Sequence, residues 1–229
     1  MELPHQQIAQ VALAGKLIYL AIPKNGNSFV RRVMNQIEMR ALSVGKELCY
    51  TDSESTYDFD KQFLFTVAQL PGGIRASISE ETWVLFTIIR NPYERVMSCF
   101  YDKSTNPNAA GTRAQLPSRA WRDFPSFIEE LGRKDRLMLD GHWMPQRYQF
   151  GGLFPYISHF IDLASLDSDL PNLLTKVYGR AAVFHTFPDS HATAQKREPL
   201  SRELASRETV ETINALYADD FASLGYETL

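Results

Sequence analysis

A short polar turn, PKNGNS at residues 23–28, joins two very different segments. The apolar run Leu17–Ile22 precedes it and predicts a buried strand, and the amphipathic segment that follows predicts a helix. Backbone N–H groups at a helix N-terminus are unpaired and carry partial positive charge, so they attract phosphate. Lys24 adds a full positive charge at the same place. The pattern predicts an anion site, and a nucleotide is the simplest ligand for it.

A second strand with a charged ending is predicted at 83–89, WVLFTII. Its β-branched and aromatic residues indicate burial on both faces, as in a parallel sheet. The next residues signal a helix start, because Asn91 can cap, Pro92 suits the first helical position and Glu94 can complete a capping box.

Arg90 lies between this strand and this helix, and Ser98 lies two turns inside the helix. An arginine fork suits bidentate contact with phosphate, and a serine hydroxyl can add a hydrogen bond. A small helix residue facing the core is the alternative for Ser98. Ligands of parallel sheets bind at the carboxyl ends of the strands, which both Lys24 and Arg90 follow. Two phosphate sites at adjacent strand ends suit a nucleotide phosphorylated at two positions.

The alternation of strands and helices predicts an α/β fold with a central, mainly parallel sheet flanked by helices. Strands are expected at 16–22, 83–89 and 156–163, and helices at 28–40, 91–102, 124–131, 170–178 and 207–224. Residues 63–70 fit a helix or a strand, and 41–60, 104–120 and 142–154 are expected to be irregular. A single domain is expected over 1–229, with an N-terminal extension at 1–15.

The composition disfavours several classes. Residue counts of 24 Lys+Arg and 27 Asp+Glu give a net charge of −3, which argues against a general nucleic-acid binder. Cys49 and Cys99 have neither the number nor the spacing of a disulfide framework or a metal site. The N-terminus does not read as a signal peptide, and no segment approaches the roughly 20 apolar residues of a membrane span. A cytoplasmic location is the expectation.

A phosphoryl-transferring P-loop has the pattern GxxxxGK[ST], in which Ser or Thr binds magnesium. The chain has no GK[ST], and Lys24 precedes Gly26. The second strand is followed by Arg90 rather than by an acidic metal ligand. These differences disfavour a kinase or an ATPase.

Four motifs resemble those of sulfotransferases that use 3′-phosphoadenosine 5′-phosphosulfate (PAPS), in the expected order. PKNGNS at 23–28 resembles their 5′-phosphosulfate loop, and residues 88–103, IIRNPYERVMSCFYDK, resemble their 3′-phosphate site, R-x-P-x-x-R-x-x-S. Residues 140–146, DGHWMPQ, resemble the HW-x-PQ segment of the carbohydrate branch. Residues 216–226, LYADDFASLGY, resemble its closing Y-x-x-D-F-x-x-x-G-Y.

The resemblance implies a three-layer, P-loop-like α/β fold. It also implies in-line transfer of a sulfuryl group from PAPS to an acceptor hydroxyl, leaving PAP and needing no metal. The animal enzymes are Golgi membrane proteins with paired cysteines after the HW segment, whereas residues 147–155 hold no cysteine. The chain therefore resembles a bacterial, cytosolic member, and its acceptor would be a glycan, a glycolipid or a small natural product. Segments 41–80 and 104–120 would line the acceptor side. Oligomeric state is not predicted.

The resemblance also implies roles for individual residues. Cofactor-binding candidates are Pro23, Lys24, Asn25, Gly26, Asn27, Ser28, Arg90, Ser98, Lys196 and Arg197. Lys24 is a catalytic candidate because a fixed cation stabilises charge that builds on the bridging oxygen. His142 is the second, as the general base for the acceptor's proton. Weaker candidates for the base are Glu80, Glu81, Asp140, His159 and His185.

Each role has a structural alternative. The turn residues can simply cap a helix, and His142 with Trp143 can anchor a loop. Arg95 is expected on the helix surface or in a salt bridge, and Lys196-Arg197 fit a solvated pair. Core or loop packing is the default for aromatic residues that could instead stack on a sugar or on adenine, namely Trp121, Trp143 and Tyr148. A PAP-binding module without turnover, and a nucleotide-dependent kinase, are the alternative functions.

Overall fold

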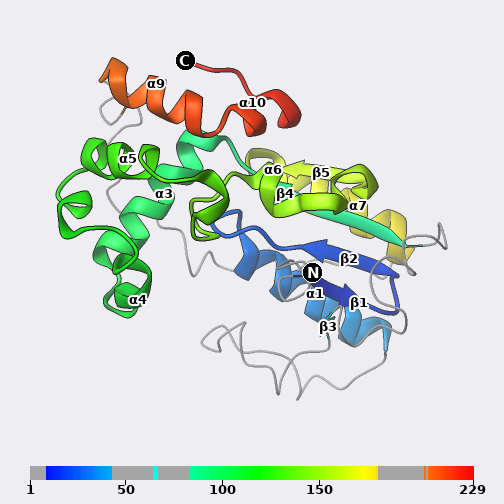
Figure 1. The fold of residues 1–229 in the computed structure, drawn as a ribbon. Helices are drawn as coiled ribbons and strands as arrows, with labels where there is room; N and C mark the ends of the chain where they lie inside the picture. The colour runs from blue at the N-terminus through cyan, green and yellow to red at the C-terminus, as the bar shows by residue number, and fades with distance from the viewer. Residues whose placement is uncertain (1–8, 43–63, 67–82, 180–203, 205) are drawn as a thin grey trace. The chain divides into compact units, whose positions relative to one another are not determined.

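The structure is a computed structural model that describes residues 9–42, 64–66, 83–179, 204 and 206–229. The chain divides into two compact units (Figure 1). The sheet unit comprises Met1–Ile89 and Gly151–Ala192, and the helical unit comprises Arg90–Phe150 and Thr193–Leu229. Several expectations concern residues outside the described ones, namely Cys49, Glu80, Glu81, His185, Lys196 and Arg197.

The sheet unit contains a five-stranded sheet in the order β3-β1-β2-β4-β5. Strands β2 (Leu17–Leu20), β4 (Val84–Ile89) and β5 (His159–Asp162) run parallel to one another. In this register Tyr19 lies opposite Phe86, and Phe86 opposite His159. The strands expected at 16–22 and 83–89 are thus neighbours, and the predicted α/β class is confirmed.

Strand β1 (Ala9–Ala12) lies in the segment expected to be an N-terminal extension. It pairs antiparallel with β2 and with β3 (Phe65–Thr66), so the described part of the segment 63–70, which fitted a helix or a strand, contains a two-residue strand. The turn from β1 to β2 needs Gly15, because a Cβ there would lie 2.3 Å from the ring carbon Cζ of Tyr178. A hairpin, rather than an extension, leads into the predicted anion-binding strand.

Helices α1 (Asn27–Ala41) and α7 (Leu166–Tyr178) pack on one face of this sheet. The predicted apolar stripe of α1 is buried there, with Val30, Met34 and Ile37 against Tyr19 and Phe86. A buried carboxylate joins the elements at the far end of α1. Glu38 accepts hydrogen bonds from the Ala14 N–H at 2.7 Å and the Tyr178 hydroxyl at 2.8 Å.

The helical unit is built from α3 (Pro92–Thr105), α4 (Ala110–Arg113), α5 (Phe124–Gly132), α6 (Gln146–Phe150), α9 (Arg207–Leu216) and α10 (Ala218–Leu224). Its core is rich in aromatic rings, with Phe127 in contact with both Trp121 and Trp143. Cys99 is buried in the same core, as expected.

Three expectations for this part of the chain were wrong. The segment 104–120, expected to be irregular, forms α4 and short 3-10 turns, and it buries Leu116 and Ala120 although many of its residues are exposed. The segment 142–154 is likewise helical in large part, with α6 and a 3-10 helix at Gly151–Tyr156. The helix expected at 207–224 breaks at Tyr217, whose side chain is fully buried. Tertiary packing outweighs the local turn signals in the first two segments and the helical periodicity in the third.

Candidate functional site

The predicted 5′-phosphate loop connects β2 to α1 within the sheet unit. Two of its residues have left-handed backbone angles, Lys24 with φ 71° and Gly26 with φ 76°. Asn25 is fully buried, and its Nδ2 donates to the Ile88 carbonyl of β4 at 2.7 Å. This bond ties the loop to the neighbouring strand. Lys24, by contrast, is partly exposed.

The loop opens α1 in a way that suits an anion. Gly26 is the N-cap, and among the described residues no side chain caps this helix and no acidic residue lies in its first turn. Val30 makes the first intrahelical bond, donating to the Gly26 carbonyl at 3.1 Å. The N–H groups of the three residues before Val30 therefore lack an intrahelical acceptor. The alternative in which the turn side chains cap α1 is not what the structure has, since Gly26 is the N-cap and Asn27 Oδ1 accepts from the Tyr19 hydroxyl at 2.6 Å.

Glycine is required at position 26 for two reasons. Its φ lies in the region that other residues reach only with strain, and a Cβ would lie 2.9 Å from Cδ1 of Leu163. Lys24 adopts a similar φ without being glycine, which is the kind of stored backbone strain that concentrates at functional sites. The backbone of the loop thus takes a left-handed conformation at both Lys24 and Gly26.

Arg90 stands at the start of the helical unit, immediately before α3. Its Nε lies 3.4 Å from the Glu94 carboxylate, so Glu94 pairs with Arg90 instead of completing the predicted capping box. Asn91 does cap α3, accepting from the Tyr93 N–H at 3.0 Å. Ser98 is almost fully buried in α3. Arg90 is buried too, at 8% exposure against 4% for Ser98, so burial agrees with the core-facing alternative for Ser98 but does not rank the two as phosphate candidates.

His142 and Asp140 form a pair on the loop before α6. Asp140 Oδ1 accepts from the His142 backbone N–H at 2.9 Å and lies 2.5 Å from the ring Nδ1. Asp140 Oδ2 accepts from Gln115 Nε2 at 3.1 Å. Burial opposes ionisation of Asp140, but these hydrogen bonds, above all that from the His142 ring, outweigh it and lower its pKa to about 2. A carboxylate therefore holds Nδ1 of His142, and the imidazole is about a third exposed.

Buried side-chain donors bind the backbone carbonyls of the loop that carries His142. Arg95, expected at the surface, is 1% exposed, and its guanidinium donates to the carbonyls of Met144 at 2.9 Å and Gly141 at 3.0 Å. Gln149 Nε2 donates to the same two carbonyls. The Tyr217 hydroxyl donates to the Trp143 carbonyl at 2.7 Å. Three buried side chains therefore hold the backbone on both sides of His142. These supporting residues, which the sequence analysis missed, are Arg95, Gln149 and Tyr217.

The aromatic candidates divide clearly. Trp143 is buried in the core, and Trp121 packs against that core with its Nε1 donating to the Arg113 carbonyl. Tyr148 donates its hydroxyl to Asp219 at 2.5 Å, and this bond raises its pKa. His159 lies on β5 in the sheet unit, where burial lowers its pKa. The stacking hypothesis is therefore wrong for Trp143, and His159 and His142 belong to different units.

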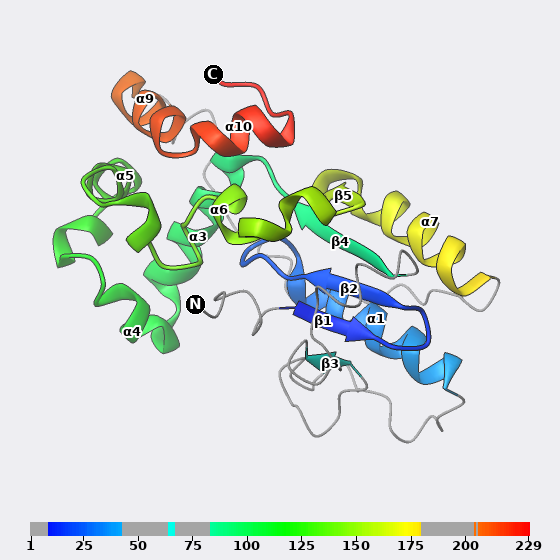
Figure 2. The same cartoon turned by 45° about the vertical axis from the view of Figure 1, so that its right-hand side comes forward.

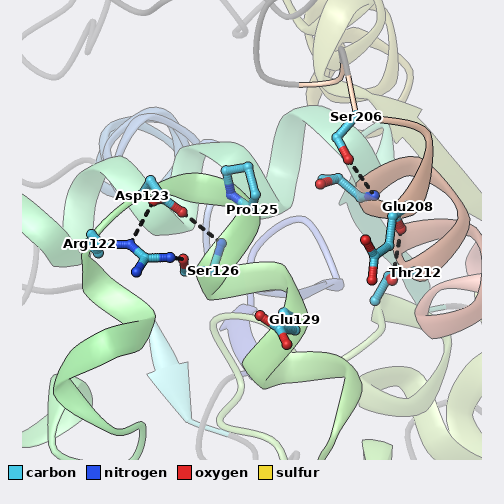
Figure 3. Close-up of a pocket in the computed structure, with 9 residues that line it drawn as sticks. Arg122, Asp123, Pro125, Ser126, Glu129, Ser206, Glu208 and Thr212 are labelled. Carbon is cyan, nitrogen blue, oxygen red and sulfur yellow. Dashed lines mark hydrogen bonds and ion pairs between the residues drawn. The ribbon is translucent and has the colours of Figure 1, made fainter.

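A hollow of about 390 Å³ in the helical unit lies elsewhere on that unit's surface (Figure 3). It lies where α5 and α9 begin, and its polar groups already bind one another. Asp123 caps α5 by accepting from the Ser126 N–H, and Ser206 caps α9 by accepting from the Thr209 N–H. It contains none of the predicted site residues, so the chemistry must be sought at the loops described above.

Of the predicted site residues, 23–28 lie in the sheet unit, and Arg90 and His142 lie in the helical unit. A mixed sheet whose strands β2, β4 and β5 run parallel, with a lysine-bearing turn between β2 and α1, defines the class, an α/β protein of P-loop-like architecture. The chain belongs to the sulfotransferase family, whose model matches residues 10–227, and it is thus an enzyme of sulfate transfer. No curated protein and no solved structure matches it significantly.

Among the residues that the structure describes, no three His, Cys, Asp or Glu side chains gather as a metal site. In the same part of the chain, no helix has both the length and the apolar character of a membrane span.

Proposed function

We propose that the protein transfers the sulfuryl group of PAPS to an acceptor hydroxyl by in-line displacement, with PAP as the second product. The observation that carries the proposal is the loop at 23–28, where Lys24 precedes a helix whose first N–H groups lack intrahelical acceptors. The 5′-phosphosulfate of PAPS offers the oxygen acceptors that such a loop needs.

Lys24 has the central role on the donor side. Gly26 and the opening N–H groups of α1 would hold the 5′-phosphate, and the Lys24 ammonium would lie against the oxygen that bridges phosphorus and sulfur. Negative charge grows on that oxygen as the S–O bond breaks, so a fixed cation lowers the energy of the transition state more than that of the bound substrate. Arg90 would contact the 3′-phosphate.

His142 would take the proton of the acceptor hydroxyl. Because Nδ1 faces the Asp140 carboxylate, the favoured neutral tautomer carries its proton on Nδ1 and leaves the Nε2 lone pair for the acceptor. Asp140 also stabilises the imidazolium that forms. This arrangement makes Asp140 a partner of His142 rather than an independent base.

The acceptor side of the site is proposed to lie beside His142 and Asp140. Gln115 links the segment 104–120 to Asp140, which supports the proposal that this segment lines the acceptor side. A hydroxyl of a glycan, a glycolipid or a small natural product is the proposed acceptor, and a cytoplasmic location goes with the bacterial type of sequence.

The test is a radiolabelled PAPS assay over a panel of such acceptors, with binding measured separately by calorimetry. We expect sulfate transfer, PAP affinity and no requirement for magnesium. His142→Ala should lose about 10²–10⁴ in rate while keeping PAP affinity. Affinity for PAP without transfer to any acceptor would indicate a binding module, and stabilisation by ATP with magnesium would indicate a kinase. Near-normal activity of His142→Ala would exclude it as the base.

A further inference from the structure

Gln146, the last residue of the DGHWMPQ segment, clasps the backbone of Arg90. Its Oε1 accepts from the Arg90 N–H at 3.0 Å, and its Nε2 donates to the Arg90 carbonyl at 2.8 Å. Gln146 is fully buried. One side-chain amide therefore satisfies both polar backbone groups of Arg90, much as a neighbouring strand would.

Asp220, from the closing segment of the chain, holds Gln146 in turn. Its carboxylate accepts from the Gln146 N–H at 2.9 Å and from the Arg147 N–H at 2.7 Å. Asp220 is also fully buried, and α10, which carries it, lies beside α6 (Figure 2). Burial raises the pKa of Asp220, against the opposing effect of these backbone donors.

We infer that Gln146 and Asp220 are positioning residues that hold Arg90 for the 3′-phosphate of the donor nucleotide, an inference that rests on the proposed function. Arg90 lies at the junction between β4 and α3, where the backbone leaves the sheet ladder and enters a helix. Gln146 supplies the partners for the Arg90 backbone at this junction. Asp220 orients the residue that supplies them.

The chemistry explains why these residue types are needed. The Arg90 backbone needs one donor and one acceptor in a plane, which the Gln146 amide offers. Asn carries the same amide on a shorter chain, and Glu would set a carboxylate oxygen against the Arg90 carbonyl. A bidentate contact between arginine and phosphate tolerates little displacement, because both N–H donors must align at once. A loosened Arg90 backbone should therefore weaken recognition of the 3′-phosphate alone.

The test compares two nucleotides that differ only in that group, PAP and AMP. Calorimetry gives the dissociation constant of each for wild type, Gln146→Leu, Gln146→Glu and Arg90→Ala, with folding checked by thermal melting. We expect the preference for PAP over AMP to fall about ten- to a hundredfold in the Gln146 variants, with AMP affinity within about twofold of wild type. Adding Gln146→Leu to Arg90→Ala should cause no further loss of preference.

Gln149→Leu is the matched control, because it removes another buried glutamine of α6 whose amide contacts carbonyls of the His142 loop and not Arg90. It should keep the PAP preference even if it lowers the melting temperature. A wild type without preference for PAP refutes the proposed 3′-phosphate site itself. A wild type that prefers PAP through Arg90, with Gln146→Glu unchanged, overturns the inference. Should Gln146→Leu fail to fold, Gln146→Glu and Asp220→Asn decide the question.

Discussion

Replacing Asp140 by Asn tests the proposed chemistry most directly. Asn keeps the shape of the side chain and an oxygen that can accept from the His142 backbone and ring, but it removes the negative charge. The wild-type carboxylate lies 2.5 Å from His142 Nδ1 and is only 20% exposed, so solvent screens the interaction weakly. The charge matters most when His142 becomes an imidazolium in the transition state.

The magnitude follows from the kind of hydrogen bond lost. A bond to a charged partner contributes about 1.5–3 kcal/mol and a neutral one about 0.5–1.5 kcal/mol, so the charge accounts for about 1–2 kcal/mol. The lowering of the Asp140 pKa from 3.8 to about 2 amounts to roughly 2 kcal/mol, the net of its hydrogen bonds to His142 and Gln115 against burial, and is of the same order. At 1.36 kcal/mol per tenfold, Asp140→Asn should lower kcat about five- to thirtyfold.

The assay is the single-turnover rate of sulfate transfer at saturating PAPS, set beside PAP affinity from calorimetry. The rate should fall and the affinity should not, because Asp140 acts through the base. Asp135→Asn is the control, since Asp135 accepts from the Leu137 N–H at an exposed turn. In a His142→Ala background, Asp140→Asn should have no further effect. A wild-type rate for Asp140→Asn, or an equal loss of rate and affinity, would refute the reasoning.

Four further outcomes are expected. Lys24→Ala should lower kcat by at least about a hundredfold and PAP affinity much less, as kinetics and calorimetry would measure. Equal losses in kcat and in affinity would disprove a role in the transition state. Gly26→Ala should lower the free energy of unfolding by about 1–2 kcal/mol or more in denaturant titrations, because the φ at position 26 is positive and the added Cβ would contact Leu163. Gly152→Ala is the control and should not lower it, since the added Cβ would meet open space. Arg95→Lys should cost about 2–3 kcal/mol in the same assay by losing one fork of a buried pair of bonds, and a wild-type value would contradict that role. The pKa of Asp140 in the folded protein lies below its ordinary value. Its contribution of roughly 2 kcal/mol to the free energy of unfolding is therefore present above about pH 4 and lost as the pH falls toward 2. Asp140→Asn should make the free energy of unfolding depend less on pH over that window.

Local signals in the sequence determined the elements around the donor loop. The apolar run before Lys24 and the stripe of Val30, Met34 and Ile37 predicted β2 and α1, and both are present with the expected buried face. Asn91 and Pro92 predicted the start of α3 correctly. These predictions succeed because caps, turns and helical periodicity depend on residues a few positions apart.

Such local signals did not predict how the N-terminus of α1 is capped. The same Asn and Ser residues that cap helices elsewhere leave that role to Gly26, since the Asn27 side chain accepts from the hydroxyl of Tyr19 on β2. The break at Tyr217 was also invisible, because the apolar periodicity continues through it while the tyrosine hydroxyl reaches the Trp143 carbonyl.

The sequence by itself determined which residues can hold phosphate and which can take a proton, because residue type sets charge and proton affinity. Only the tertiary structure decided what supports them. Hydrogen bonds join Asp220 to Gln146 over a sequence separation of 74 residues, Gln146 to Arg90 over 56, and Arg95 to Gly141 over 46. Hydrogen bonds over such separations exist only after the chain has folded, so no local pattern of residues specifies them.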